Sequence, residues 1–110
     1  MKKSRLGEFQ ELILMTVVVL QEDAYGNEIQ RNLELRLKEN LSMGAIQTAL
    51  KRMEDKGFLT SEWGEVTQKR GGKRKRIYQA TPLALQVLND MKSIRTELWQ
   101  AMPELSNAKA

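Results

Sequence analysis

The stretch that decides the fold is residues 42–57, which read SMGAIQTALKRMEDKG. Ser42 is a good N-cap, and Gly57 is a natural residue just past a helix C-terminus. Four apolar residues between them recur at helical spacing and predict one buried stripe: Ile46, Ala49, Leu50 and Met53. We therefore expect a helix over about 43–56 whose polar face points away from the core.

The polar face of this predicted helix carries side chains suited to contacting nucleic acid. A turn and another amphipathic helix precede it, and such a pair forms a helix-turn-helix when the second helix enters a major groove. Ser, Thr and Gln bind base edges, whereas Lys and Arg reach phosphates or guanine. The expected contacts are Ser42, Gly44, Gln47, Thr48, Lys51 and Arg52. The alternative is an ordinary solvated helix face, with Arg52 in a salt bridge to Asp55 or across the domain.

A basic β-hairpin is expected directly after this helix. Strands are predicted over about 58–66 and 74–80, around the hairpin-turn signal Gly71-Gly72. Six of the eight residues from 69 to 76 are Lys or Arg, which exceeds the net charge of +4 of the whole chain. Because like charges on neighbouring strands repel, we expect a polyanion there rather than only solvent. The expected contacts are Arg70, Gly71, Gly72, Lys73, Lys75 and Arg76.

A long amphipathic helix is expected next. Thr81 suits the N-cap, Pro82 suits the first helical position, and the pattern continues to about Ala101. A helix of about 20 residues is roughly 30 Å long, more than a domain of this size easily covers. We expect a second copy of the chain to cover its apolar stripe, the alternative being packing on the first helix alone. The expected dimer interface is Val87, Leu88, Met91, Ile94, Leu98, Trp99 and Met102.

The sequence before residue 42 predicts two further helices. Residues 8–21 are apolar on most sides and predict a nearly central helix, although three consecutive valines also allow a strand. A turn over 23–27 leads into a helix that ends near Lys38. The expected fold class is mainly α with a small β-hairpin: a winged helix-turn-helix DNA-binding domain over residues 1–81, a C-terminal dimerisation helix over 82–103 and a flexible tail over 104–110.

Composition narrows the class of function. The 110 residues fit one domain and include no Cys and no His, which removes disulfides, thiolate nucleophiles, thiol or imidazole metal sites and the usual general base. We therefore expect no enzyme, no cofactor and no metal ion. The main apolar run, residues 12–20, is far shorter than the roughly 20 residues of a membrane span. We expect a cytoplasmic protein with no membrane partner.

Several motifs, taken in order, resemble the PadR family of bacterial transcriptional regulators. The resemblance covers about residues 6–102. The helix signature SxGAIxxxLxRMExKG and the wing signature RGGKxKRxY together make it specific. The other matching pieces are Leu6-Gly7-Glu8-Phe9, Leu12-Ile13-Leu14, Ala24-Tyr25-Gly26 and Thr81-Pro82.

The resemblance implies a winged-helix homodimer that binds double-stranded DNA at inverted-repeat operators, usually as a repressor. Some short relatives bind flat aromatic compounds at the dimer interface. A further hypothesis is therefore an aromatic effector in a pocket lined by Met91, Trp99 and the first helix. The family often has Tyr at the position of Gln47, where Gln can itself pair with adenine.

Two other classes of function stay open on the residues alone. One is an RNA- or ribosome-associated module that uses the same basic hairpin. Single-strand binders usually carry several exposed aromatic side chains, and near this hairpin we expect only Tyr78 to offer one. The other is a protein-interaction adaptor whose functional surface is the last helix.

Overall fold

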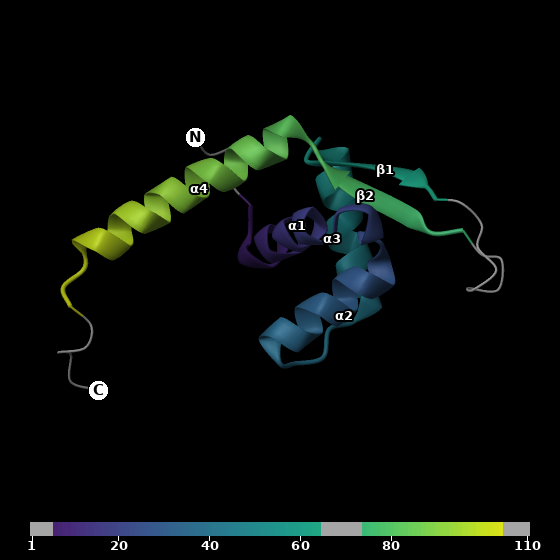
Figure 1. Cartoon of the computed structure of the whole chain (residues 1–110), viewed down its shortest axis with the longest axis horizontal. Helices are drawn as coiled ribbons and strands as arrows, with labels where there is room; N and C mark the ends of the chain where they lie inside the picture. The colour runs from purple at the N-terminus through teal and green to yellow at the C-terminus, as the bar shows by residue number, and fades with distance from the viewer. Residues whose placement is uncertain (1–5, 65–73, 105–110) are drawn as a thin grey trace.

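The computed structural model describes residues 6–64 and 74–104 of the chain. Most of these residues are helical, and two strands form one antiparallel hairpin, which confirms the expected fold class (Figure 1). The elements in order are α1 (Glu8–Leu20), the 3-10 helix η2 (Gln21–Asp23), α2 (Gly26–Leu37), α3 (Met43–Asp55), β1 (Leu59–Trp63), β2 (Arg76–Ala80) and α4 (Pro82–Ala101).

The core lies where α1 meets α2, α3 and the hairpin. The three valines that also allowed a strand belong to α1, so the helical interpretation is correct. The predicted stripe of α3 is buried, with each of its four side chains at most 5% exposed. Full burial of a Leu or Ile stabilises by about 1.5–3 kcal/mol, so this stripe fixes which face of α3 points outward. The other core residues are Leu6, Ile13, Leu14, Val17, Ala24, Ile29, Leu33, Phe58, Leu59, Ala84 and Val87.

Side-chain hydrogen bonds fix the connection from α2 to α3. Lys38 ends α2 in the left-handed region, with φ 59°. The Glu34 carboxylate accepts the Leu41 backbone N–H at 2.8 Å, and the Gln30 amide donates to the Leu41 carbonyl at 2.8 Å. Ser42 then caps α3 as predicted, because its hydroxyl oxygen accepts a backbone N–H of the first turn at 3.0 Å. These bonds set the direction in which α3 starts.

The hairpin is anchored at its base. The Tyr78 N–H donates to the Ala24 carbonyl at 2.9 Å, which joins β2 to the segment just before α2. β2 begins at Arg76, two residues later than predicted. The strand register runs from Leu59 opposite Ala80 to Trp63 opposite Arg76. The predicted tip, with Arg70, Gly71, Gly72 and Lys73, lies outside the described residues.

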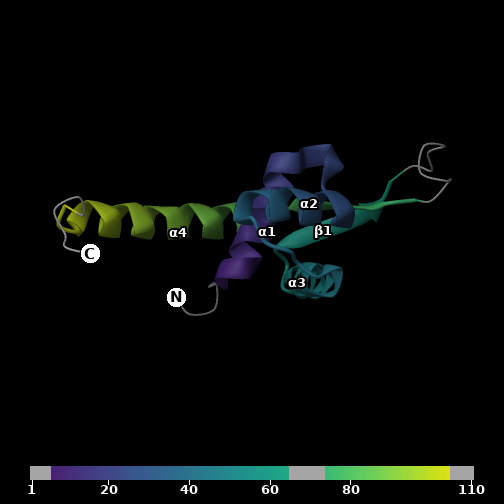
Figure 2. The same cartoon turned by 90° about the horizontal axis from the view of Figure 1, so that it is seen from below.

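Helix α4 projects from the body as an arm (Figure 2). The Thr81 hydroxyl accepts the Ala84 N–H at 3.2 Å and donates to the Gly57 carbonyl at 2.7 Å, which fixes where the helix starts. Ala84 and Val87 are its buried residues, and residues 92–101 are all exposed. The molecule is 56 Å along its longest axis, and the arm and the hairpin point toward opposite ends of that axis (Figure 1).

Over 6–64 and 74–104, no helix combines the length and the apolar character needed to cross a membrane. Within the same ranges, no three acidic side chains gather at a potential metal site.

Candidate nucleic-acid interface

The outer face of α3 is open and polar. Because the opposite stripe is buried in the core, this face is held toward solvent. Gly44 and Ala45 are both exposed, so only small residues cover the first turn. Every residue of this segment that we expect to contact DNA is exposed: Ser42, Gly44, Gln47, Thr48, Lys51 and Arg52.

Two of these residues have partners within the chain. The hydroxyl oxygen of Ser42 is occupied by its capping bond, which leaves the hydroxyl proton as its donor. The Lys51 ammonium lies 3.5 Å from the Asp55 carboxylate, and both side chains are largely exposed. Such a pair contributes only about 0.3–0.5 kcal/mol, so an incoming phosphate can replace the carboxylate. The carboxylate of Asp55 is paired with Lys51, and not with Arg52 as the alternative interpretation of the sequence allowed.

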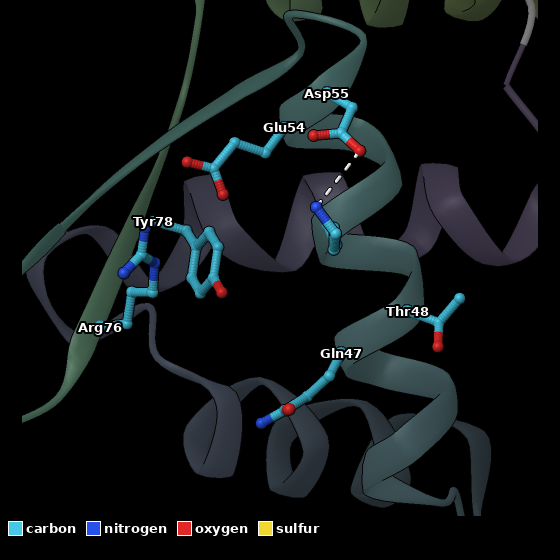
Figure 3. Close-up of a pocket in the computed structure, with 7 residues that line it drawn as sticks. Gln47, Thr48, Glu54, Asp55, Arg76 and Tyr78 are labelled. Carbon is cyan, nitrogen blue, oxygen red and sulfur yellow. Dashed lines mark ion pairs between the residues drawn. The ribbon is translucent and has the colours of Figure 1, made fainter.

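A groove of about 590 Å³ lies between α3 and the hairpin (Figure 3). We call it the α3 groove, and its lining residues are Gln47, Thr48, Lys51, Glu54, Asp55, Arg76 and Tyr78. In Figure 3 the side chains from α3 lie on one side, and Arg76 and Tyr78 of β2 lie on the other. The groove therefore brings three predicted helix contacts close to one predicted wing contact, Arg76.

Arg76 is held in place by residues of β1. Its Nε donates to the Ser61 Oγ at 2.9 Å, and that hydroxyl donates to the Glu54 carboxylate at 2.7 Å. Its guanidinium carbon lies 5.1 Å from the centroid of Trp63, the residue directly opposite in the ladder. These contacts to Arg76 could not be predicted from the sequence, because a cross-strand contact appears only once the register of the hairpin is known.

Trp63 also corrects one expectation. It is 55% exposed, so Tyr78 is not the only aromatic side chain that the hairpin offers to solvent. Tyr78 itself is only half-exposed. The hairpin therefore exposes one more aromatic ring, of the kind that single-strand binders use for stacking, than the sequence indicated.

Tyr78 is a phenol on the wall of the α3 groove. Burial raises the pKa of its hydroxyl above the ordinary value of 10.0, the Glu54 carboxylate adds to the rise, and Arg76 opposes it. At neutral pH the hydroxyl therefore keeps its proton. It can donate a hydrogen bond to an acceptor in the groove.

The order of these elements and the motifs on them match a known family. Residues 13–90 match the family model described as "Transcriptional regulator PadR-like family". The chain belongs to the PadR-like family of transcriptional regulators. This match confirms the resemblance drawn from the motifs, and the family is one of regulators rather than of enzymes. A comparison with curated proteins gave no match.

Solved PadR-like structures share the fold. A PadR-like transcriptional regulator from Bacillus cereus strain ATCC 14579 has a TM-score of 0.71 at 21% identity, with 92% of this chain and 93% of that chain covered. One from hypervirulent Clostridium difficile R20291 has a TM-score of 0.60 at 28% identity, with 84% and 93% covered. One from Eggerthella lenta DSM 2243 has a TM-score of 0.66 at 23% identity, with 93% and 88% covered. The winged-helix fold of PadR-like regulators thus extends over most of the chain.

On this PadR-like fold, the predicted dimer-interface residues, which lie on α4 and at its C-cap Met102, fall into two groups. Val87 is buried in the core of its own chain, and Leu88 and Met91 are partly buried against that core. The other four are between 40% and 62% exposed: Ile94, Leu98, Trp99 and Met102. Within one chain, the outer half of the apolar stripe is therefore the part that a partner can cover.

The predicted effector pocket combines residues from both groups. Met91 is half-buried beside the body, whereas Trp99 is 62% exposed on the arm. Their positions differ by eight residues, which places them about 12 Å apart along the helix. Within one chain, Met91 is thus held against the body while Trp99 faces solvent.

An ion pair that the sequence analysis missed ties the arm to α1. Both terminal nitrogens of the Arg95 guanidinium donate to the Glu11 carboxylate, one of them at 2.6 Å. The Glu11 side chain is 5% exposed, whereas the Arg95 side chain is 52% exposed. The hydrogen bonds that Arg95 donates to Glu11, and the negative charge of that carboxylate, raise the pKa of Arg95 above its ordinary value. No local pattern signals this pair, because the two residues are 84 positions apart.

Proposed function

We propose that the protein is a sequence-specific transcriptional repressor that binds an inverted-repeat DNA operator as a homodimer. In this proposal, α3 lies in the major groove and the hairpin follows the flanking backbone or the minor groove. The observation that supports it most is the α3 groove, which sets the exposed polar face of α3 beside a cation of the hairpin. Helix-turn-helix and winged-helix proteins contact base edges with one helix and contact phosphates with basic side chains.

The proposed contacts have two roles. Gln47 and Thr48 bind base edges, together with the hydroxyl proton of Ser42. Lys51 and Arg52 bind phosphates beside them. The proposed contacts of the hairpin with the backbone or minor groove come from Arg70, Lys73, Lys75 and Arg76, with Gly71 and Gly72 allowing a close approach.

A second copy of the chain completes the proposed site. The outer half of α4 exposes Ile94, Leu98 and Trp99 on a projecting helix, and contiguous apolar surface of this kind marks an interaction site. Antiparallel or crossed pairing with a second α4 covers it. Such a pairing relates the two α3 helices by a two-fold axis, which is the symmetry of an inverted repeat.

Selection of bound sequences from randomised duplex DNA, followed by fluorescence anisotropy, tests the proposal. We expect an inverted repeat to bind in preference to a scrambled duplex. Gln47→Ala or Thr48→Ala should change the selected sequence, because these side chains face the bases. The double variant Lys73→Gln/Lys75→Gln should weaken binding to all duplexes about equally, because phosphate contacts carry no sequence information.

Lys38→Gln, an exposed lysine at the end of α2, is the matched control and should leave affinity and preference unchanged. A changed preference in the hairpin variant with an unchanged one in the α3 variants would overturn the division of roles. A dimer that prefers no duplex sequence would contradict the function and favour the protein-interaction adaptor.

A further inference from the structure

A second cavity adjoins the α3 groove. It lies between the start of α2, α3 and the end of the hairpin ladder where Trp63 pairs with Arg76, and it has a volume of about 340 Å³. It shares Gln47, Arg76 and Tyr78 with the α3 groove. We call it the hairpin cavity. Its wall also includes Tyr25 and the amide side chain of Asn27, neither of which the proposed function uses.

The two cavities differ in charge. In the α3 groove, the cations of Lys51 and Arg76 are matched by the carboxylates of Glu54 and Asp55. The hairpin cavity is lined by three cations from consecutive residues, 74 to 76, and among the described residues that line it there is no carboxylate. An anion is therefore attracted to the hairpin cavity more strongly than to the α3 groove.

Aromatic rings support two of the three cations. The Lys75 ammonium lies 5.3 Å from the ring centroid of Tyr25, and the Arg76 guanidinium lies 5.1 Å from that of Trp63. The Arg76 Nε also donates to the Ser61 Oγ at 2.9 Å, which leaves the two terminal nitrogens of Arg76 outside this bond. Long side chains that are already ordered lose less conformational entropy when they bind, so these rings prepare the cations for a ligand.

The same geometry favours a phosphate over an aromatic ligand. Each ring carries one of the chain's own cations on a face, which reduces what the ring offers for stacking. What the cavity presents instead is positive charge together with the amide groups of Asn27 and Gln47. Cations and amide N–H groups are the usual protein donors to phosphate oxygens.

We propose that the hairpin cavity seats one backbone phosphate of duplex DNA, bound by Lys75 and Arg76, and that Trp63 and Tyr25 are positioning residues that hold those cations. The inference rests on the proposed DNA-binding function and adds a contact between α2 and the hairpin. It also assigns a role to Trp63, a large apolar side chain that is otherwise left 55% exposed at the edge of the hairpin.

The test measures binding of the full chain to its selected duplex by fluorescence anisotropy over a range of salt concentrations. The logarithm of affinity falls with the logarithm of salt by about 0.9 per phosphate neutralised. Lys75→Gln should therefore lower the slope by about 0.9 for each site occupied in the complex. The control Lys38→Gln removes the same charge from the end of α2 and should leave the slope unchanged.

The positioning role is tested with a matched pair of variants at Trp63. Trp63→Leu should weaken binding about two- to fivefold, the equivalent of one exposed cation–π contact, and should lower the salt slope. Trp63→Phe keeps a ring and should restore most of the affinity and the slope. Because Trp63 is exposed, both variants should keep the thermal unfolding midpoint of the original chain. A structural role alone would move that midpoint and leave the salt slope intact.

The outcomes separate the inference from the proposed function. An unchanged salt dependence of affinity in Lys75→Gln would overturn the phosphate site in the hairpin cavity while DNA binding stands. Equal affinities of Trp63→Leu and Trp63→Phe would do the same. If the original chain binds no duplex, the proposed function and the phosphate site in the hairpin cavity are both wrong. Titration with inorganic phosphate at constant ionic strength distinguishes a free anion from DNA. Tight binding of inorganic phosphate that Lys75→Gln abolishes would identify a free-anion site and overturn the assignment to DNA.

Discussion

Side chains of the interface are constrained to different degrees. Gln47 and Thr48 of α3 line the α3 groove, and both are exposed. Arg76 is fixed by Ser61 and Trp63 on the facing strand. In the proposed complex, base readout therefore depends on side chains that can adjust to a ligand, whereas the proposed backbone contact of Arg76 comes from a side chain that is already in position.

Ser42 has two possible roles, and two substitutions separate them. Ser42→Ala should destabilise the chain by about 1 kcal/mol through loss of the cap, whereas Ser42→Gly should cost only a few tenths of a kcal/mol. Chemical denaturation measures this difference. If Ser42 also contacts DNA, both variants lose the same affinity, because both lack the hydroxyl. If Ser42→Ala loses more DNA affinity than Ser42→Gly, in parallel with its lower stability, the role of Ser42 is restricted to capping.

The pKa of Tyr78 predicts how stability changes at alkaline pH. Because the pKa is raised on folding, the unfolded phenol loses its proton before the folded one does. The contribution of the Tyr78 phenol to the free energy of unfolding is therefore complete below the ordinary pKa of about 10. It is lost as the pH rises through the pKa of the folded state. Urea denaturation should show a fall in unfolding free energy above about pH 10 that is shallower in Tyr78→Phe. An identical fall in both proteins would contradict this assignment.

Helices and strands show which part of the structure the sequence determines. The buried stripe of α3 and its Ser42 cap follow from local periodicity, and both were predicted. The long-range contacts were not. The support of Arg76 depends on strand register, and the pair of Glu11 with Arg95 joins elements from opposite ends of the chain. Local patterns carry no signal for such pairs, because the fold as a whole brings them together.

The pair between α1 and α4 gives a prediction at this scale. Arg95→Gln leaves the Glu11 carboxylate nearly buried without its cation, which should lower the thermal unfolding midpoint by roughly 5 °C. The double variant Glu11→Gln/Arg95→Gln should recover part of the loss, because a neutral amide needs no counter-charge. Calorimetry of the two variants measures the difference. A double variant less stable than Arg95→Gln would argue against a charge-based role.

The molecule as a whole is extended, because its arm and its hairpin point toward opposite ends of the longest axis (Figure 1). The sequence predicted the length of α4 and the excess of apolar residues along it. It did not show that Val87 belongs to the core of its own chain while Leu98 remains exposed. That division depends on where α1 ends against α4, which is a property of the tertiary structure.

The exposed arm predicts the effect of a charge on assembly. Leu98→Glu places a carboxylate on the outer stripe and should convert the proposed dimer to a monomer that keeps its fold, because Leu98 is 60% exposed within one chain. Light scattering after size-exclusion chromatography measures the mass, and Gln100→Glu is the control on the same helix. A Leu98→Glu variant that stays dimeric would place the interface elsewhere.

Hydroxyl-radical footprinting of the selected DNA fragment, with the original chain and with Leu98→Glu side by side, tests the central claim most directly. For the original chain we expect two protected patches related by the two-fold symmetry of the site, with centres about 10–10.5 base pairs or a multiple of that apart. For the monomeric variant we expect weak protection or none. One protected patch that is the same for both proteins would contradict a dimer that sets one α3 helix into each half of an inverted repeat.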